Sequence, residues 1–316
     1  MTSRDLRRLA AERRAKMDAV FIPTPRTAEA HEQFHFLMEH SAESASNKLC
    51  VLLVAPSQSG KSRVIETFAD EMNTAEKLSR REIPVLHVTL HAEVTRKGLA
   101  QDILIALQRF GFETGPMKGS EPEMWERVYR YLRAGAVQLL VLDEIHHVKT
   151  TTSAMARSVG ECIKHALLEG PCPIVLSGIY TAELPFRANE QLQQRAIPPI
   201  DLRRFRPDVP TDLDLFIEFL AAYLVRLEEL GIAKNATAVI EGDCPTCILE
   251  VSGGVLGAAC RLLKEAVVIM TLDGRDDLRR SDLIKATNEA FIRPGMYDRN
   301  PFSLGVANIR SEQRDD

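Results

Sequence analysis

Short apolar runs recur along the chain up to residue 202, and each is followed by small or polar residues. The runs lie in Leu49–Ser62 (LCVLLVAPSQSGKS), Ile83–Leu90 (IPVLHVTL), Val137–Val148 (VQLLVLDEIHHV), Pro173–Gly178 (PIVLSG) and the shorter Ile197–Leu202. Unbroken apolar runs of this length are typical of strands that a parallel sheet buries on both faces. Arg63–Asp70 carries helical periodicity, and about one helix length separates the third run from the fourth, in keeping with right-handed strand–helix–strand winding. The pattern predicts an α/β fold with a parallel sheet flanked by helices.

From Pro210 the pattern changes, and helical periodicity replaces the strand-like runs. The helical stretches are Asp212–Leu230, the glycine-interrupted Ile248–Met270, and Ser281–Ile292, which begins with a capping serine. We interpret them as a C-terminal helical lid on an α/β nucleotide-binding domain. The predicted parts are a basic N-terminal arm (1–28), the nucleotide-binding domain (29–209), the helical lid (210–293) and a flexible tail (294–316).

The first apolar run continues through a turn into Gly60-Lys61-Ser62 and a helix, which is the setting of a phosphate-binding loop. A glycine lets backbone N–H groups wrap the phosphates, and the helix directs its positive end at them. Lys61 is expected to reach the β- and γ-phosphates of ATP, and the Ser62 hydroxyl to bind Mg²⁺. Ala55 stands where the pattern has its first glycine, and because alanine disfavours a left-handed backbone, weaker nucleotide binding is expected. The predicted nucleotide-binding residues are Pro56, Ser57, Gln58, Ser59, Gly60, Lys61, Ser62, Arg63 and Asp143.

Four further polar residues lie next to the predicted strands. Asp143 and Glu144 end the run VQLLVL, and an acid at a strand end beside a phosphate loop holds the Mg²⁺ shell. Asp143 and Ser62 are therefore the predicted metal residues, and Glu144 is placed to polarise the attacking water. Ser177 occupies the position of a residue that senses the γ-phosphate, and Arg195, just before the last strand, could reach the nucleotide of a neighbouring subunit. Glu144, Ser177 and Arg195 are the predicted catalytic residues.

The net charge of −4 argues against nucleic-acid binding by the whole surface but leaves room for a local basic track. Arg96 and Lys97 lie on one polar connection and Lys118 and Ser120 on a second, and because both connections leave the same sheet they could converge. Solvated loop charge is the ordinary alternative.

The first sixteen residues form a second basic segment on a helix-prone background. Met1–Lys16 contains six basic and two acidic side chains. This arm could dock on a partner or lie along phosphate, and a solvated, frayed N-terminus is the open alternative.

Composition sets the remaining bounds. No run approaches eighteen apolar residues and the N-terminus is charged, so no membrane segment or signal is predicted and a cytoplasmic protein is expected. The scattered cysteines fit reduced thiols, and the single C-x-x-C pair lacks a second pair at zinc spacing. The cysteines are Cys50, Cys162, Cys172, Cys244, Cys247 and Cys260.

In their order along the chain, the segments APSQSGKS, LLVLDEIHH, IVLSG, NEQLQQRA and SGGVLGAACRLLKEA resemble the TniB/TnsC-type AAA+ ATPases of DNA transposition. The entry segment AVFIPTPRTAEA resembles that of TniB proteins, and the similarity covers about residues 10–290. The resemblance implies an AAA+ core with a helical lid. Two departures are Ala55, in place of glycine, and Ala258, where relatives often have an arginine.

The resemblance also implies a function. It predicts an ATP- and Mg²⁺-dependent ATPase that oligomerises as rings or filaments on duplex DNA. Because base-reading residues are not evident in the sequence, little sequence preference is expected. Such a regulator recruits or stimulates a partner transposase, often with a TniQ-like target selector. On matching positions, Ser177 is the sensor, Arg195 the trans-acting finger, and Arg96, Lys97, Lys118 and Ser120 the DNA-contacting residues.

Two other classes share the same motifs. A helicase-loader or replication-initiator ATPase has the same core, and a non-hydrolysing nucleotide-binding scaffold would be consistent with Ala55.

Overall fold

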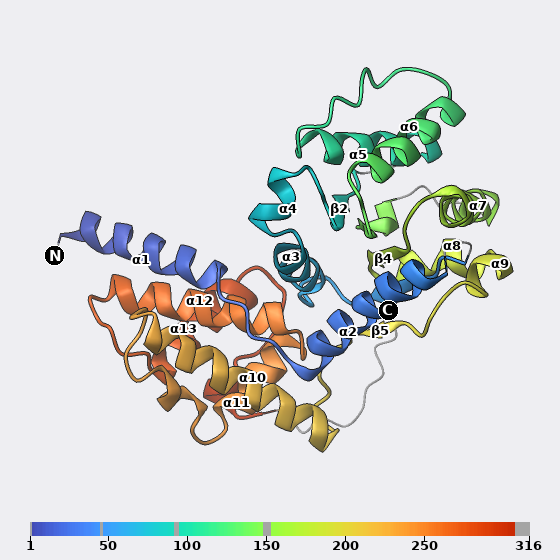
Figure 1. The fold of residues 1–316 in the computed structure, drawn as a ribbon. Coiled ribbons are helices and arrows are strands. Elements are labelled where there is room, and N and C mark those ends of the chain that lie inside the picture. Colours follow the sequence, from blue (N-terminus) through green and yellow to red (C-terminus); the bar gives the residue numbers. More distant parts are fainter. Residues whose placement is uncertain (1, 45–46, 92–94, 148–152, 307–316) are drawn as a thin grey trace. The chain divides into compact units, whose positions relative to one another are not determined.

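The computed structural model describes residues 2–44, 47–91, 95–147 and 153–306 (Figure 1). The chain divides into two compact units. One unit is Pro25–Leu202, and the other combines Met1–Thr24 with Arg203–Asp316. None of the helices in the described ranges is both long enough and apolar enough to cross a membrane.

The unit Pro25–Leu202 is built on a parallel sheet, which confirms the predicted fold class. Within the described residues its strand order is β2 (Val85–Thr89), β3 (Leu139–Asp143), β4 (Ile174–Gly178), β1 (Cys50–Val54) and β5 (Ile200–Asp201). The central strands β1, β3 and β4 are almost wholly buried, as their unbroken apolar runs predict.

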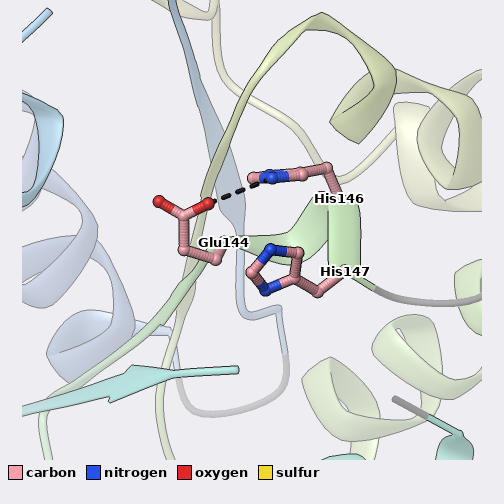
Figure 2. Close-up of side chains that lie close together, drawn as sticks. All are labelled: Glu144, His146 and His147. Atoms are coloured by element: carbon pink, nitrogen blue, oxygen red, sulfur yellow. Dashed lines mark ion pairs between the residues drawn. The ribbon is translucent and has the colours of Figure 1, made fainter. Parts of the chain in front are cut away.

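The register of the strands determines which polar residues meet. Val54 pairs with Gly178, and Thr89 pairs with Asp143, so the carboxyl ends of these strands share one edge of the sheet. β3 ends at Asp143 and leads through Glu144 into a short 3-10 helix, η1 (Ile145–His147), at this edge (Figure 2).

Helices connect and flank the strands. Their bounds are α2 (Pro25–Glu43), α3 (Lys61–Met72), α4 (Ala75–Ser79), α5 (Arg96–Gln108), α6 (Glu121–Ala134), α7 (Ser153–Glu169), α8 (Leu184–Arg187) and α9 (Glu190–Gln193), with the 3-10 helix η2 (Tyr180–Glu183). The starts of two helices are fixed by hydroxyl side chains. Thr95 Oγ1 accepts a hydrogen bond from the N–H of Gly98 at 3.1 Å, and Ser120 forms a capping box with Glu123.

The second unit is helical, as the C-terminal pattern predicts. It contains α1 (Ser3–Asp18), α10 (Pro210–Glu229), η3 (Ala236–Ile240), α11 (Cys244–Ser252), α12 (Leu256–Leu272), α13 (Arg280–Thr287), the π-helical turn η4 (Asn288–Ile292) and α14 (Pro301–Leu304). Large side chains fully buried in its core include Phe216 and Tyr223.

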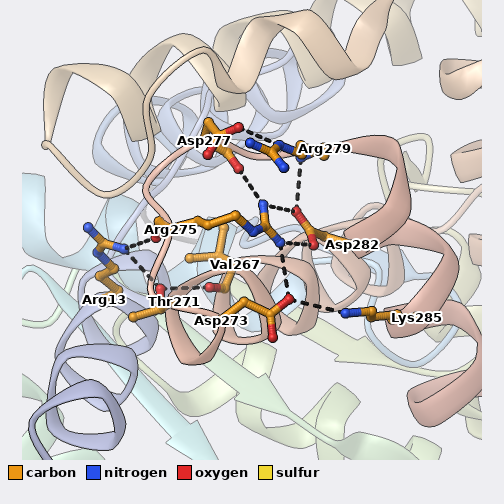
Figure 3. Close-up of polar contacts among 9 residues, drawn as sticks. All are labelled: Arg13, Val267, Thr271, Asp273, Arg275, Asp277, Arg279, Asp282 and Lys285. Carbon is orange, nitrogen blue, oxygen red and sulfur yellow. Dashed lines mark hydrogen bonds and ion pairs between the residues drawn. The ribbon is translucent and has the colours of Figure 1, made fainter. Parts of the chain in front are cut away.

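The N-terminal helix belongs to this helical unit. Arg13 is buried, and its guanidinium donates to Thr271 Oγ1 at 2.9 Å and to Asp276 Oδ1 at 2.5 Å. The loop that holds it is braced by Arg275, which pairs with the fully buried Asp282 (Figure 3). The predicted basic arm is thus in part a packed helix, and Arg13 binds α1 to the helical unit through Thr271 and Asp276.

The tail predicted from residue 294 also begins as packed structure. Phe302 is buried in the core of the helical unit, and Asn300 donates to the Ile284 carbonyl at 3.0 Å. Residues 307–316 of that segment lie outside the described residues.

Candidate functional site

The phosphate loop lies between β1 and α3, as the sequence predicts. Gly60 precedes the first helical residue with φ of +93°, a conformation that favours glycine, and Gln58 also has a positive φ of 64°. Ala55 is not among the residues with positive φ; it is fully buried, and its N–H donates to the Gly178 carbonyl at 3.2 Å. The conformational reason for expecting Ala55 to weaken nucleotide binding therefore does not apply.

Lys61 lies folded over this loop. Its side chain is buried, and Nζ donates to the carbonyls of Ala55 and Pro56, both at 2.9 Å. Burial lowers the pKa of the Lys61 ammonium, while the negative charges of Glu144 and Asp143 act in the opposite direction. The Lys61 ammonium is therefore held at the predicted phosphate-binding loop, where it interacts electrostatically with Asp143 and Glu144.

Asp143 is the centre of the polar cluster at the strand ends. Its Oδ2 accepts from Ser62 Oγ at 2.8 Å, and its Oδ1 accepts from Ser177 Oγ at 2.6 Å and from the N–H of Glu144 at 2.9 Å. The Nε2 of His87 lies 3.5 Å from Oδ2. Burial acts to raise the pKa of Asp143, but the contacts from His87, Ser177, Ser62 and the Glu144 N–H outweigh it and lower the pKa to about 2. Asp143 is therefore a carboxylate at every physiological pH.

The predicted metal residues fit a magnesium ion chemically. Ser62 Oγ lies in the first turn of α3, 2.8 Å from Asp143 Oδ2 at the end of β3. Both are hard oxygen ligands, which Mg²⁺ prefers together with phosphate oxygens. Asp143 supplies the negative charge, and Ser177 orients it from the adjacent strand. These two residues would hold the ion next to the phosphate loop.

Glu144 follows Asp143 in an unusual backbone conformation. Its φ is +59°, in the left-handed region that non-glycine residues rarely adopt. Its carboxylate Oε2 lies 3.1 Å from Nε2 of His146. Burial lowers the pKa of His146, while the negative charge of Glu144 acts in the opposite direction.

Arg195 lies at the other end of β1. Its carbonyl accepts from the N–H of Cys50 at 2.9 Å, and its guanidinium donates to Asn47 at 3.2 Å. Cys50 begins β1, whereas the phosphate loop follows its last residue, Val54. Within one subunit the structure therefore separates Arg195 from the Asp143 cluster by the length of a strand.

The predicted DNA-contacting residues lie at the starts of α5 and α6, and the structure brings these two starts together. Arg96 pairs with Glu121 at 2.8 Å, and Gln101 donates to the Met117 carbonyl at 3.1 Å. Lys118 is exposed, and the Ser120 side chain takes part in the capping box of α6. Arg96 is thus partly neutralised by an acid, a partner that sequence reasoning did not identify.

Sequence reasoning also missed His87 and His146. His87 is the first polar residue in the run IPVLHVTL and the only ionisable one, which is a usable signal because it interrupts a buried stretch of strand at the position opposite Val141. His146 is visible in the sequence as part of DEIHH, but its contact with Glu144 depends on the tight turn into η1.

Three solved structures place the fold. The ORC2 protein of Aeropyrum pernix in its ADP form has a TM-score of 0.62 at 16% identity, over 87% of this chain and 72% of that chain. Cdc6p from Pyrobaculum aerophilum has a TM-score of 0.56 at 16% identity, over 86% and 70%. The A. pernix ORC1 protein in complex with DNA has a TM-score of 0.55 at 17% identity, over 85% and 66%. At these identities the likeness shows the AAA+ fold alone.

Comparison at the level of sequence gives the family. A search of curated proteins finds no match. The family model described as Bacterial TniB protein matches residues 14–206, a span that includes the phosphate loop, both acids, Ser177 and Arg195. Because this match covers more than half of the chain, the protein belongs to the TniB family.

Proposed function

We propose that this protein is an ATP-dependent regulator of DNA transposition, which oligomerises on target duplex DNA and recruits or stimulates a partner transposase, with a TniQ-like protein as target selector. The observation that carries the proposal is the cluster of Ser62, Asp143 and Ser177 beside Lys61, in a chain of the TniB family. The family match favours transposition over the helicase-loader or replication-initiator alternative, since the likeness to the ORC and Cdc6 structures extends to the fold alone.

The proposed hydrolysis uses residues from three strand ends. The N–H groups of the loop and the start of α3 would bind the phosphates, with Lys61 at the β- and γ-phosphates. Ser62 and Asp143 would hold Mg²⁺, which neutralises phosphate charge when bound. Glu144 would orient a water molecule and accept its proton, and Ser177 would keep Asp143 in place through its 2.6 Å hydrogen bond.

Assembly is proposed to complete this site. Arg195 lies a strand length from the phosphate loop of its own subunit, so a role in hydrolysis requires the loop of a neighbouring subunit. An arginine supplied in this way stabilises charge on the transferred phosphoryl group. Hydrolysis and homo-oligomerisation are therefore expected to depend on each other.

DNA binding is proposed at the joined starts of α5 and α6. Lys97, Lys118 and Arg96 would face phosphate there, and an oligomer would repeat them once per subunit. Contacts of this kind carry no base readout, so binding is expected to be insensitive to sequence and steeply dependent on salt.

The test uses the full chain with duplexes of unrelated sequence in the presence of ATP, a non-hydrolysable analogue, ADP or no nucleotide. Sedimentation and electron microscopy should detect rings or filaments on DNA with ATP or the analogue and not with ADP. Arg195→Ala should lose assembly-linked turnover while single subunits still bind nucleotide; Arg80→Ala, which removes an exposed arginine paired with Glu76 on α4, is the matched control.

The outcome for the partner is measured separately. Adding a purified candidate partner transposase should yield a complex only with the ATP-bound assembly. Equal DNA binding with ADP and ATP, or capture of a replicative helicase in place of the transposase, would contradict the proposal.

A further inference from the structure

A second polar group lies beside the Asp143 cluster, at the turn that follows β3. It consists of Glu144, His146 and His147, and each residue is half-buried and offers one atom suited to a metal ion. These ligand atoms all lie within 4.8 Å of one another, with Glu144 Oε2 and His146 Nε2 at 3.1 Å. Figure 2 shows the carboxylate and the two rings gathered around one space.

The separation of these atoms suits a tetrahedral metal centre. Nitrogen and oxygen ligands about 2.1 Å from a tetrahedral zinc ion lie about 3.4 Å from one another. The Glu144–His146 pair is already close to this spacing, and the widest separation in the group would have to shorten by at most about 1.4 Å. A side-chain rotation of that size is available to residues that are not fully buried.

The hydrogen bond of the His147 ring leaves its other nitrogen free to act as a ligand. Nδ1 of His147 lies 3.1 Å from the carbonyl of Leu90; since a carbonyl only accepts, Nδ1 carries the proton and Nε2 carries the lone pair. A backbone carbonyl that holds the second nitrogen is a common orienting contact of metal-binding histidines. In His146, Nδ1 is buried without a hydrogen-bond partner among the described residues, and Nε2 faces Glu144.

We propose that Glu144, His146 and His147 form a binding site for one transition-metal ion of the zinc class, and that the bound ion blocks hydrolysis by occupying Glu144. Two imidazoles and one carboxylate are a ligand set that zinc accepts, whereas Mg²⁺ prefers oxygen ligands. The magnesium residues Ser62 and Asp143 and this site are therefore chemically distinct. The inhibitory consequence rests on the proposed ATPase function, and the binding itself does not.

Metal binding is tested first, without nucleotide. The chelator-treated full chain is titrated with Co²⁺, followed by its visible absorption, and with Zn²⁺, followed by calorimetry. One equivalent should bind, and His146→Ala and His147→Ala should each weaken binding by about 100-fold or more, since even loss of an orienting partner costs about 10- to 100-fold. His91→Ala is the matched control, because His91 contacts a carboxylate, Asp102, at 2.7 Å outside this group.

Inhibition is tested second, by the rate of phosphate release from Mg·ATP with and without Zn²⁺. Each protein's own zinc-free rate is the reference, and nucleotide binding is measured in parallel. Zinc should reduce wild-type turnover at least tenfold and leave nucleotide binding intact, and the reduction should disappear in His147→Ala.

Three results would overturn the assignment. They are the absence of a Co²⁺ spectrum in the wild type, equal metal affinity in wild type and both histidine variants, and full turnover by zinc-saturated wild type. A protein that binds Co²⁺ as expected but does not hydrolyse ATP even without zinc would refute the proposed ATPase function and not the metal site.

Discussion

The positive φ of Glu144 indicates backbone strain at the proposed catalytic turn. With φ of +59°, Glu144 occupies the left-handed region, where an L-residue is less stable than glycine by about 1–2 kcal/mol. Such strain is found at functional sites, where the fold over-determines the conformation. We predict that Glu144→Gly is more stable than Glu144→Ala. Both substitutions remove the carboxylate and its 3.1 Å contact with His146, so they differ only in the Cβ.

The size of the difference follows from two opposing terms. Glycine removes about 1–2 kcal/mol of strain in the folded state but adds about 0.4–1 kcal/mol of unfolded-chain entropy. The net advantage of Glu144→Gly over Glu144→Ala is therefore about 1 kcal/mol in the free energy of unfolding. Ala136 is a matched control, because it is exposed, has φ of +48° and lies at a turn outside the site. Ala136→Gly should stabilise the wild type by about the same amount.

The assay is urea unfolding at pH 7, with ATP turnover measured on the same samples. Both Glu144 variants should lose turnover by about two orders of magnitude or more, as expected for loss of a general base. If Glu144→Gly is no more stable than Glu144→Ala while Ala136→Gly gains stability, the turn at Glu144 is not strained and the reasoning fails.

Three more predictions concern single contacts. Ser177→Ala removes a buried hydrogen bond to Asp143 and should lower the free energy of unfolding by about 2 kcal/mol in urea, whereas exposed Ser79→Ala should change it by less than about 0.5. Because the pKa of Asp143 falls to about 2 on folding, its ionisation stabilises the fold fully above about pH 4. In urea unfolding, this contribution should make the free energy of unfolding of the wild type about 2 kcal/mol larger than that of Asp143→Asn, and the difference should disappear as the pH falls to 2. Glu121→Gln frees Arg96 and should raise DNA affinity up to about fivefold at low salt in anisotropy titrations, an effect that Glu76→Gln should lack.

The sequence predicts those residues of the site that lie at the carboxyl ends of parallel strands. Lys61, Ser62, Asp143 and Ser177 follow apolar runs, and the carboxyl ends of neighbouring parallel strands meet at one edge. Runs of this kind therefore indicate both the strands and the contacts that follow them. The order β2-β3-β4-β1-β5 cannot be predicted from the apolar runs, because the runs do not indicate which strands are neighbours.

Contacts between segments far apart in the sequence, and the backbone conformations of single residues, cannot be predicted from the apolar runs. Arg13 reads as a cation of an exposed basic arm, because Thr271, its buried partner, lies 258 residues away in the sequence. The left-handed conformation of Glu144 has no sequence signal, since glycine or asparagine is the usual mark of such a backbone. The pairing of Arg96 with Glu121 likewise depends on how α5 and α6 meet.

We propose that Lys61 and the Asp143 cluster form an ATPase site whose turnover depends on DNA. The most direct measurement is phosphate release from Mg·ATP by the full chain, with and without duplex DNA, for the wild type and Lys61→Ala. Turnover should rise with DNA in the wild type and be absent in Lys61→Ala. If the wild type binds ATP but releases no more phosphate than Lys61→Ala in the presence of DNA, the protein is a nucleotide-binding scaffold and the claim is wrong.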